Sequence, residues 1–177
     1  LHYQHPDIIK FITYKSKDIQ FLWNFNISVA LDEKFINAVE NDTDFELIDP
    51  KTKQVVGTEK AREVWDLMAK CAWESGDPGF VVIDRINNTE SNPTPELGQI
   101  ESTNPCGEQP LLPWEPCTLG SINLSNHTKQ VNGKYVVDWE KLENTSKLST
   151  NFLENVVEMS NYTLPEIEKI SKMNRRI

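Results

Sequence analysis

The stretch GDPGFVVID, residues 76–84, decides the fold class. Its apolar run 80–83 holds three β-branched residues, as is typical of a strand that is buried on both faces. The segment before it, from Thr58, carries apolar residues at helical spacing and ends at Gly76, a residue type that commonly ends helices. A helix followed directly by a buried strand is typical of a parallel sheet. The sequence therefore predicts an α/β protein.

The segments before this stretch fit the same class. NFNISVAL, residues 24–31, alternates apolar and polar residues and so predicts a strand. Its second face carries asparagines such as Asn26, and we expect that face to line something polar. Asp32 is expected to cap a helix that follows it, and FELIDPKTKQVVG, residues 45–57, is expected to form a hairpin.

The segments after it include a long irregular region. Residues 85–121 have no periodicity and hold six of the ten prolines, so they predict a loop of a length that is commonly functional. A strand at 134–139, a long amphipathic helix over 139–160 and a last helix from Pro165 are expected to follow. The side chains expected to face inward on the long helix are Leu148, Phe152, Leu153, Val156 and Val157.

Composition excludes several classes of function. A net charge of −9 opposes non-specific binding of nucleic acid, which needs Lys and Arg to neutralise phosphates. No run reaches the roughly 18 apolar residues that cross a bilayer, and residues 1–20 lack the order of a signal peptide. We therefore expect a cytoplasmic domain with neither a membrane nor a nucleic acid as partner, whose three cysteines are free thiols.

Two of these cysteines lie in the irregular region, within NPCGEQPLLPWEPCTLGSINL, residues 104–124. Asn104 precedes a proline, which biases its backbone to extended geometry. If residues 104–108 stay extended, the side chains of Asn104, Cys106 and Glu108 point to the same side. An amide, a thiol and a carboxylate would then be presented together, as a sulfur reactant, a base and a group that orients a hydroxyl.

Structural explanations stand beside this functional one. Cys71 lies on the apolar stripe of a helix and is expected to be a small buried side chain. Cys106 and Cys117 could be incidental or could form a disulfide, although cytosolic conditions oppose the bond. No metal site is expected, because the cysteines lack a short paired spacing and His127 is the only histidine near them. Asp84, at the end of a strand, could belong to a site or to a salt-bridged turn.

At this point the sequence resembles a known family, the catalytic (large) subunit of ribonucleotide reductase. The segments that carry the resemblance cover nearly the whole chain: HPDIIKFI, NFNISVAL, GDPGFVVIDRINN, ESTNPCGEQPLLPWEPCTLGSINL and NYTLPEIEKISKMNRRI. The resemblance implies a ten-stranded α/β barrel in which a finger loop carries the catalytic cysteine. Residues 1–177 would be a central fragment of that barrel, with the finger loop at about 100–120, and we expect the fragment to be inactive alone.

The resemblance also implies roles for individual residues. Cys106 matches the cysteine that becomes a thiyl radical and abstracts the 3′-hydrogen of the substrate. Glu108 matches the carboxylate that takes the 3′-hydroxyl proton, and Asn104 the amide that binds the ribose hydroxyls. Thr103 matches a further contact to the nucleotide. Cys117 matches one of the two cysteines that reduce the 2′ position and end as a disulfide, and its partner has no counterpart in this chain.

The cofactor and partners follow from the same resemblance. The motif NPCGEQPLLP and the short interval between Cys106 and Cys117 are most similar to the adenosylcobalamin-dependent class. A separate metal-containing radical subunit is the alternative source of the radical. The implied substrate is a ribonucleoside di- or triphosphate. Nucleotide effectors, a thioredoxin-like reductant and a homodimer are implied for the complete enzyme. Two other functions stay open: a thiol redox or regulatory module, and a non-catalytic relic of the barrel.

Overall fold

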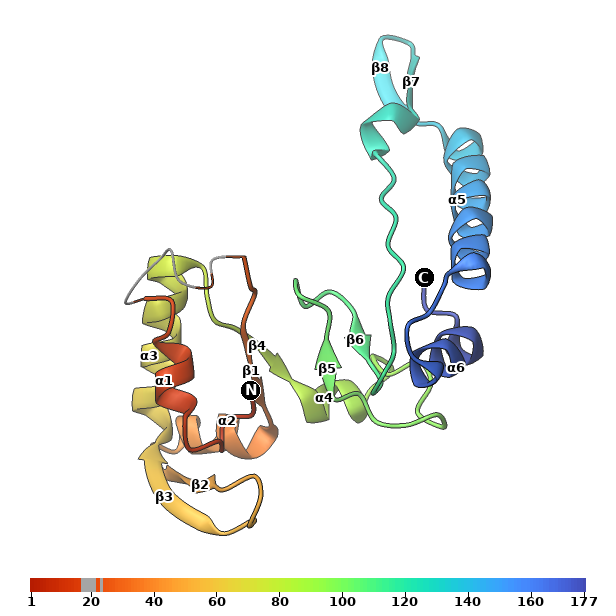
Figure 1. Cartoon of the computed structure of the whole chain (residues 1–177). Helices are drawn as coiled ribbons and strands as arrows, with labels where there is room; N and C mark the ends of the chain where they lie inside the picture. The colour runs from red at the N-terminus through yellow and green to blue at the C-terminus, as the bar shows by residue number, and fades with distance from the viewer. Residues whose placement is uncertain (17–21, 23) are drawn as a thin grey trace. The chain divides into compact units, whose positions relative to one another are not determined.

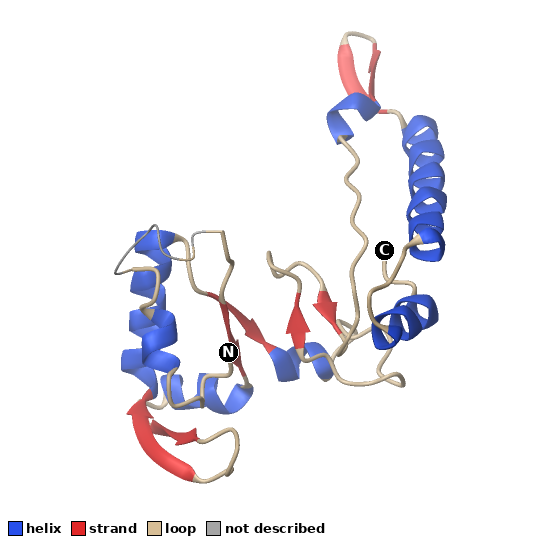
Figure 2. Ribbon diagram, viewed as in Figure 1, coloured by secondary structure: helices blue, strands red, loops and turns tan. Residues whose placement is uncertain are grey.

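The computed structural model describes residues 1–16, 22 and 24–177 (Figures 1 and 2). They form two compact units, Leu1–Pro113 and Trp114–Ile177. Unit 1 contains α1 (Ile8–Ile12), β1 (Ser28–Leu31), α2 (Glu33–Glu40), β2 (Asp44–Ile48), β3 (Val55–Lys60), α3 (Ala61–Ser75), β4 (Gly79–Val82), α4 (Ile83–Asn87), β5 (Ser102–Thr103) and β6 (Pro110–Leu111). Unit 2 contains η1 (Leu124–His127), β7 (Thr128–Val131), β8 (Lys134–Val137), α5 (Trp139–Met159) and α6 (Pro165–Asn174).

The predicted parallel pairing is present in unit 1. Strand β4 pairs in parallel with β1, with Ser28 opposite Gly79. Helix α3 ends at Ser75 and is capped by Gly76, which has a left-handed backbone (φ 81°) and donates its N–H to the Ala72 carbonyl. The prediction of an α/β chain is therefore confirmed. The strands of the described residues pair only two by two, so these residues form no closed barrel.

One expectation about β4 is wrong. Phe80 remains 53% exposed, so the strand is not buried on both faces. Its ring packs edge-on against Trp65 of α3, at 5.4 Å between centroids. The sheet consists of two strands, with residues 1–3 along the other edge of β1, and α3 covers Phe80 only in part. The apolar run thus predicted the strand correctly, but it did not predict how much of the strand other parts of this chain bury.

The core of unit 1 lies between the parallel strands, the first three helices and the β2–β3 hairpin (Figure 1). Three rings at its centre, Tyr3, Phe35 and Phe45, contact one another with centroids 4.9 to 5.4 Å apart. Burial raises the pKa of Tyr3, and the carboxylate of Asp32, which accepts a hydrogen bond from its hydroxyl, adds to the rise. Cys71 is 2% exposed in the same core, as its place on the helical stripe predicts.

Helix α2 begins as its sequence predicts. The side chain of Asp32 accepts a hydrogen bond from the Phe35 N–H at 2.9 Å. A second carboxylate, that of Asp84, accepts from the Glu33 N–H at 2.9 Å. Arg85 pairs with the side chain of Glu33. Asp84 therefore has a structural role at the start of α2, through backbone hydrogen bonds and not through the salt-bridged turn that the sequence left open.

Unit 2 is built around α5, the longest helix (Figure 2). The β7–β8 hairpin precedes it and turns at Asn132 and Gly133, both with positive φ, which suits a two-residue loop. The inward-facing stripe that we predicted on α5 is wrong in part: Val157 is 1% exposed, but Leu148 is 72% and Phe152 66% exposed. Leu153 and Val156 are half-buried, so two of the five predicted side chains are exposed within unit 2. No helix of the described residues is long and apolar enough to span a membrane.

Candidate active site

Cys106 lies in the loop of a short hairpin. Strands β5 and β6 pair antiparallel, with Thr103 opposite Pro110, and residues 104–109 connect them. The Asn104 N–H donates to the Gln109 carbonyl at 3.1 Å, and the Gly107 N–H donates to the Asn104 carbonyl at 3.0 Å. Gly107 has φ 82°, a left-handed conformation that turns the chain at little cost only for glycine. The expectation of an extended segment 104–108 is therefore wrong.

This turn changes how the three predicted side chains are presented. The side chain of Asn104 is buried, with the residue 6% exposed, and its Oδ1 accepts a hydrogen bond from the Gln109 N–H at 3.0 Å. Cys106 and Glu108 are exposed in the loop. The thiol and the carboxylate are thus accessible for chemistry, whereas the oxygen of the amide holds the loop together.

A residue without a predicted role contacts the thiol. The Nδ2 of Asn26, just before β1, lies 3.7 Å from the Sγ of Cys106. The sequence singled out Asn26 only as part of a polar strand face. Eighty positions separate the two residues, so no local pattern could have paired them. The contact places the thiol over the polar face of the segment that leads into β1.

A buried ion pair holds this segment in place. The Lys15 ammonium, on a side chain that is 6% exposed, lies 2.6 Å from the Asp77 carboxylate and also donates to the Phe25 carbonyl. The second carboxylate oxygen of Asp77 accepts from the Ile27 N–H at 3.2 Å. The backbone on both sides of Asn26 is therefore anchored to charged groups in the interior of unit 1.

A cavity of about 200 Å³ adjoins the hairpin. Asn26 and Ser28 line it from the polar face of β1, and Thr103 and Asn104 line it from the hairpin, so that face does line a partly polar space. The Thr103 hydroxyl donates to the Asn104 carbonyl at 2.9 Å. Within the described chain, the Nδ2 of Asn104 makes no hydrogen bond that would compete with a ligand.

Cys117 belongs to unit 2 and Cys106 to unit 1. Cys117 is partly buried, and Cys71, Cys106 and Cys117 are all free thiols. His127 is also in unit 2, 6% exposed, with its ring nitrogens 2.9 Å from the Asn123 carbonyl and 2.9 Å from the Thr145 hydroxyl. Both ring nitrogens are thus occupied by structural partners. Among the described residues, no group of three or more His, Cys, Asp or Glu could hold a metal ion.

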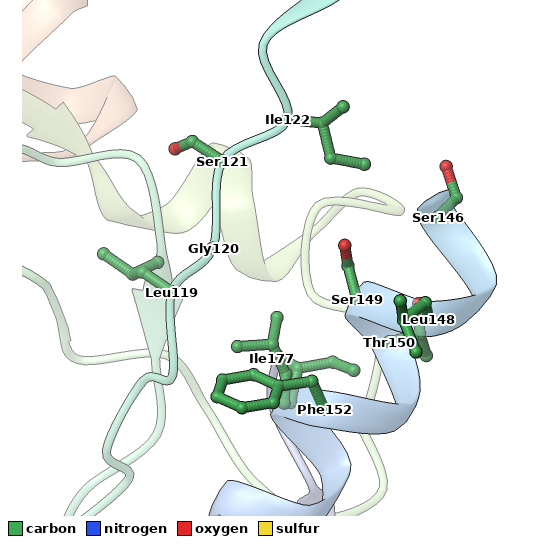
Figure 3. Close-up of a pocket in the computed structure, with 11 residues that line it drawn as sticks. Leu119, Gly120, Ser121, Ile122, Ser146, Leu148, Ser149, Thr150, Phe152 and Ile177 are labelled. Carbon is green, nitrogen blue, oxygen red and sulfur yellow. The ribbon is translucent and has the colours of Figure 1, made fainter. Parts of the chain in front are cut away.

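Unit 2 has a larger pocket of about 620 Å³, between residues 119–122 and one face of α5 (Figure 3). Its lining side chains are aliphatic, aromatic or hydroxyl-bearing, and none is ionisable. It therefore lacks a thiol or carboxylate that could react, and the cavity beside the Cys106 hairpin is the better candidate for chemistry.

Comparison with known proteins shows the family of the chain. The family model described as "Ribonucleotide reductase, barrel domain" matches residues 1–177. The chain is 44% identical to the vitamin B12-dependent ribonucleoside-diphosphate reductase of Thermoplasma acidophilum, with 100% of the chain and 22% of the relative covered. It is 41% identical to the enzyme of that name from Mycobacterium tuberculosis (100% and 25%), and 33% identical to the vitamin B12-dependent ribonucleotide reductase of Agrobacterium fabrum (93% and 14%).

The chain thus spans about a quarter or less of the length of these relatives. The family model, in contrast, covers all of it, including the hairpin with Cys106 and the segment with Cys117. The chain therefore belongs to the ribonucleotide reductase barrel-domain family.

Proposed function

We propose that this chain is the part of a ribonucleotide reductase catalytic subunit that carries its radical cysteine, and that the complete enzyme makes deoxyribonucleotides for DNA synthesis. One observation carries the proposal. Cys106 is exposed in a hairpin loop that also carries the exposed Glu108, and Thr103 and Asn104 of this hairpin line a partly polar cavity.

The proposed chemistry uses the two exposed groups in turn. A thiyl radical at Cys106 abstracts the 3′-hydrogen of the ribose, which re-forms the S–H bond and leaves a carbon radical. Glu108 takes the proton of the 3′-hydroxyl and returns it at the end of the cycle, and the 2′-hydroxyl takes a proton from a thiol of the reducing pair and leaves as water. Cys117 and a second thiol outside this chain supply two electrons and the hydrogen at C2′, and become a disulfide. Return of the 3′-hydrogen from Cys106 restores the thiyl radical.

The buried amide has a narrower role in this proposal than the sequence implied. Because the Oδ1 of Asn104 already accepts from the loop backbone, Nδ2 is the atom that would donate to a ribose hydroxyl. The Thr103 hydroxyl donates to the Asn104 carbonyl, so Thr103 would contact the nucleotide as an acceptor or through its backbone. The fixed loop would thereby orient the sugar toward the thiol.

We further propose a cobalamin cofactor, because relatives that are 44% and 41% identical are named as vitamin B12-dependent. When bound, adenosylcobalamin would supply the radical that removes the hydrogen atom of the Cys106 thiol. The residues present fit this need at the thiol itself, which is exposed and has the Asn26 amide as its polar partner. A separate metal-containing radical subunit is the alternative, and no described side chain is assigned to either source.

The substrate and partners are proposals for the complete polypeptide. Two relatives are named as ribonucleoside-diphosphate reductases, which favours a diphosphate substrate over a triphosphate. Nucleotide effectors, a thioredoxin-like reductant, a homodimer and a cytoplasmic location are proposed on the family resemblance. Neither a thiol switch nor a non-catalytic relic is favoured by any feature of the site.

The test uses the complete polypeptide that contains this segment. Reduction of all four ribonucleotides, as di- and triphosphates, would be measured with a dithiol, with and without adenosylcobalamin. We expect turnover of diphosphates only when the cofactor is present. Turnover without cobalamin but with a metal-containing subunit would replace the cofactor proposal, and absence of turnover under both conditions would contradict the function.

A further inference from the structure

A buried carboxylate lies two residues before Cys117. The side chain of Glu115 is 0% exposed, and the guanidinium of Arg176 donates two hydrogen bonds to its carboxylate. Arg176 Nε donates to Oε1 at 3.1 Å, and Nη2 donates to Oε2 at 3.2 Å. Asn174 adds a donor to Oε1 through its Nδ2. All of these residues lie in unit 2, at the end of α6 and in the segment that leads to Cys117.

The geometry of this contact fixes direction as well as position. A buried carboxylate is costly unless its oxygens are paired, so Glu115 must stay where its donors are. A guanidinium that binds both carboxylate oxygens also sets the plane of the carboxylate, which an ammonium could not do. Glu115 is therefore a fixed point of the chain next to Cys117.

The segment that carries Cys117 has few other constraints. Residues 115–123 belong to no helix or strand. Among the described residues, none of residues 116–122 takes part in a backbone–backbone hydrogen bond. On the far side of Cys117, the chain approaches α5 closely, since a Cβ added to Gly120 would lie 3.2 Å from Leu153. The position of the thiol thus depends on side-chain contacts before and after it.

The other end of the contact is itself held. Arg175 adopts a left-handed backbone (φ 51°) and bonds to α5: its Nε donates to Glu154 at 2.6 Å, and its Nη1 to Glu158 at 3.2 Å. The neighbouring Arg176 binds Glu115. Two successive arginines therefore connect the end of α6 to α5 and to the Cys117 segment.

We propose that Glu115, held by Arg176 and Asn174, is a positioning residue that sets the place of the Cys117 thiol for reduction of the substrate. This inference rests on the proposed function for the role of Cys117, and it adds a residue pair that acts through the backbone. A displacement of about 1 Å at a reacting group can cost about 100-fold in rate. The pair is therefore expected to matter for turnover and not only for folding.

The test compares Glu115→Gln with the parent in the complete polypeptide. Iodoacetamide labelling would be followed at each cysteine after cleavage at glutamates, since Glu108 separates the peptides of Cys106 and Cys117. Cys117 is partly buried in the parent. We expect it to react about tenfold faster in the variant, because the loosened segment would expose it. Labelling of Cys106 should stay unchanged, and kcat should fall about tenfold or more with KM nearly constant.

Two further variants separate positioning from simple stability. Glu115→Leu with Arg176→Leu removes both charges, a replacement that commonly restores stability. We expect this double variant to melt like the parent, yet to keep the fast labelling of Cys117 and the low kcat. Recovery of the parental labelling rate and kcat would overturn the proposal, because the pair would then be only structural. Lys172→Gln, which removes an exposed ion pair with Glu168 within α6, is the matched control and should leave the labelling of Cys117 unchanged.

The outcome remains informative if the proposed function fails. Labelling of Cys117 requires no turnover, so an unchanged rate in Glu115→Gln refutes the positioning role alone. Loss of the positioning effect and loss of ribonucleotide reduction are therefore separate results. If Glu115→Gln does not fold, the double variant carries the same comparison.

Discussion

Replacing Lys15 with methionine should loosen the segment that leads to the candidate site. Methionine keeps most of the aliphatic stem but removes the ammonium that lies 2.6 Å from the Asp77 carboxylate. The two side chains are 6% and 17% exposed, so the remaining carboxylate would be largely buried without a counter-charge. Breaking such a pair from one side costs about 3 to 5 kcal/mol. The opening equilibrium of the surrounding backbone should therefore rise by more than about 100-fold.

Native-state hydrogen exchange measures this opening directly. The informative amides are those of α1 and of residues 25–31, where Lys15 and Asp77 bind the backbone at Phe25 and Ile27. Lys70→Met is the matched control, because Lys70 is 69% exposed and its pair with Glu74 spans 4.0 Å. An exposed pair of this kind contributes about 0.5 kcal/mol or less, so the control should exchange nearly like the parent.

The reasoning also predicts coupling between the two partners. In an Asp77→Asn background no buried carboxylate would be left without a counter-charge, so Lys15→Met should destabilise the segment much less than it does in the parent. The account of this segment would be refuted if Lys15→Met and Lys70→Met changed exchange equally. It would also be refuted if the cost of Lys15→Met were the same in both backgrounds, since the burial of an unpaired charge would then not be its cause.

Three further predictions concern the loop, the amide and a helix cap. Gly107→Ala and Gly133→Ala should each lower the free energy of unfolding by about 1 to 2 kcal/mol, because both glycines have a left-handed backbone and open space at the Cβ. Only Gly107→Ala should also lower turnover, and an equal loss of turnover in both variants would contradict this. Asn104→Asp keeps the acceptor of the loop but loses the donor, so KM for the ribonucleotide should rise about tenfold while exchange of the hairpin amides stays unchanged. The Asp138 carboxylate caps α5, and its pKa is lowered mainly because the Lys129 ammonium donates to it. A lowered pKa means that the carboxylate stabilises α5 above its unfolded pKa of about 3.9 and that this contribution is lost as pH falls through the folded pKa. Protection factors of the amides in the first turn of α5, corrected for the intrinsic exchange rate, should therefore be smaller at pH 3 than at pH 6, and larger ones would contradict the prediction.

Local patterns predicted much of the fold. Asp32 and Gly76 are found at the start of α2 and the end of α3, as residue type and spacing indicated. The parallel pairing of β1 and β4 followed from a helix that leads directly into an apolar strand. The same patterns did not predict which apolar side chains remain exposed, because that depends on what other elements pack against them. Phe80 and Phe152 are exposed because their faces have little of this chain packed against them.

The backbone geometry predicted for the candidate site was wrong, and the roles of its residues stay predictions. Extended backbone was the expectation for residues 104–108, but Gly107 turns the chain and the Asn104 carbonyl accepts from it. Asn26 and Glu115 were missed because their partners are distant in sequence, 80 positions away for Asn26 and 61 for Glu115. Contacts of that span depend on the packing of several elements, which no periodicity within one segment encodes.

The most direct test of the central claim is the yield of deoxyribonucleotide from the complete polypeptide after Cys106→Ser, with substrate, dithiol and adenosylcobalamin present. Cys71→Ala serves as the control, because Cys71 is 2% exposed in the core of unit 1 and has no proposed role in the reaction. The account predicts no product from Cys106→Ser and parental turnover from the control once both variants are shown to fold. Product from Cys106→Ser at the parental rate would contradict the assignment of Cys106 as the radical cysteine.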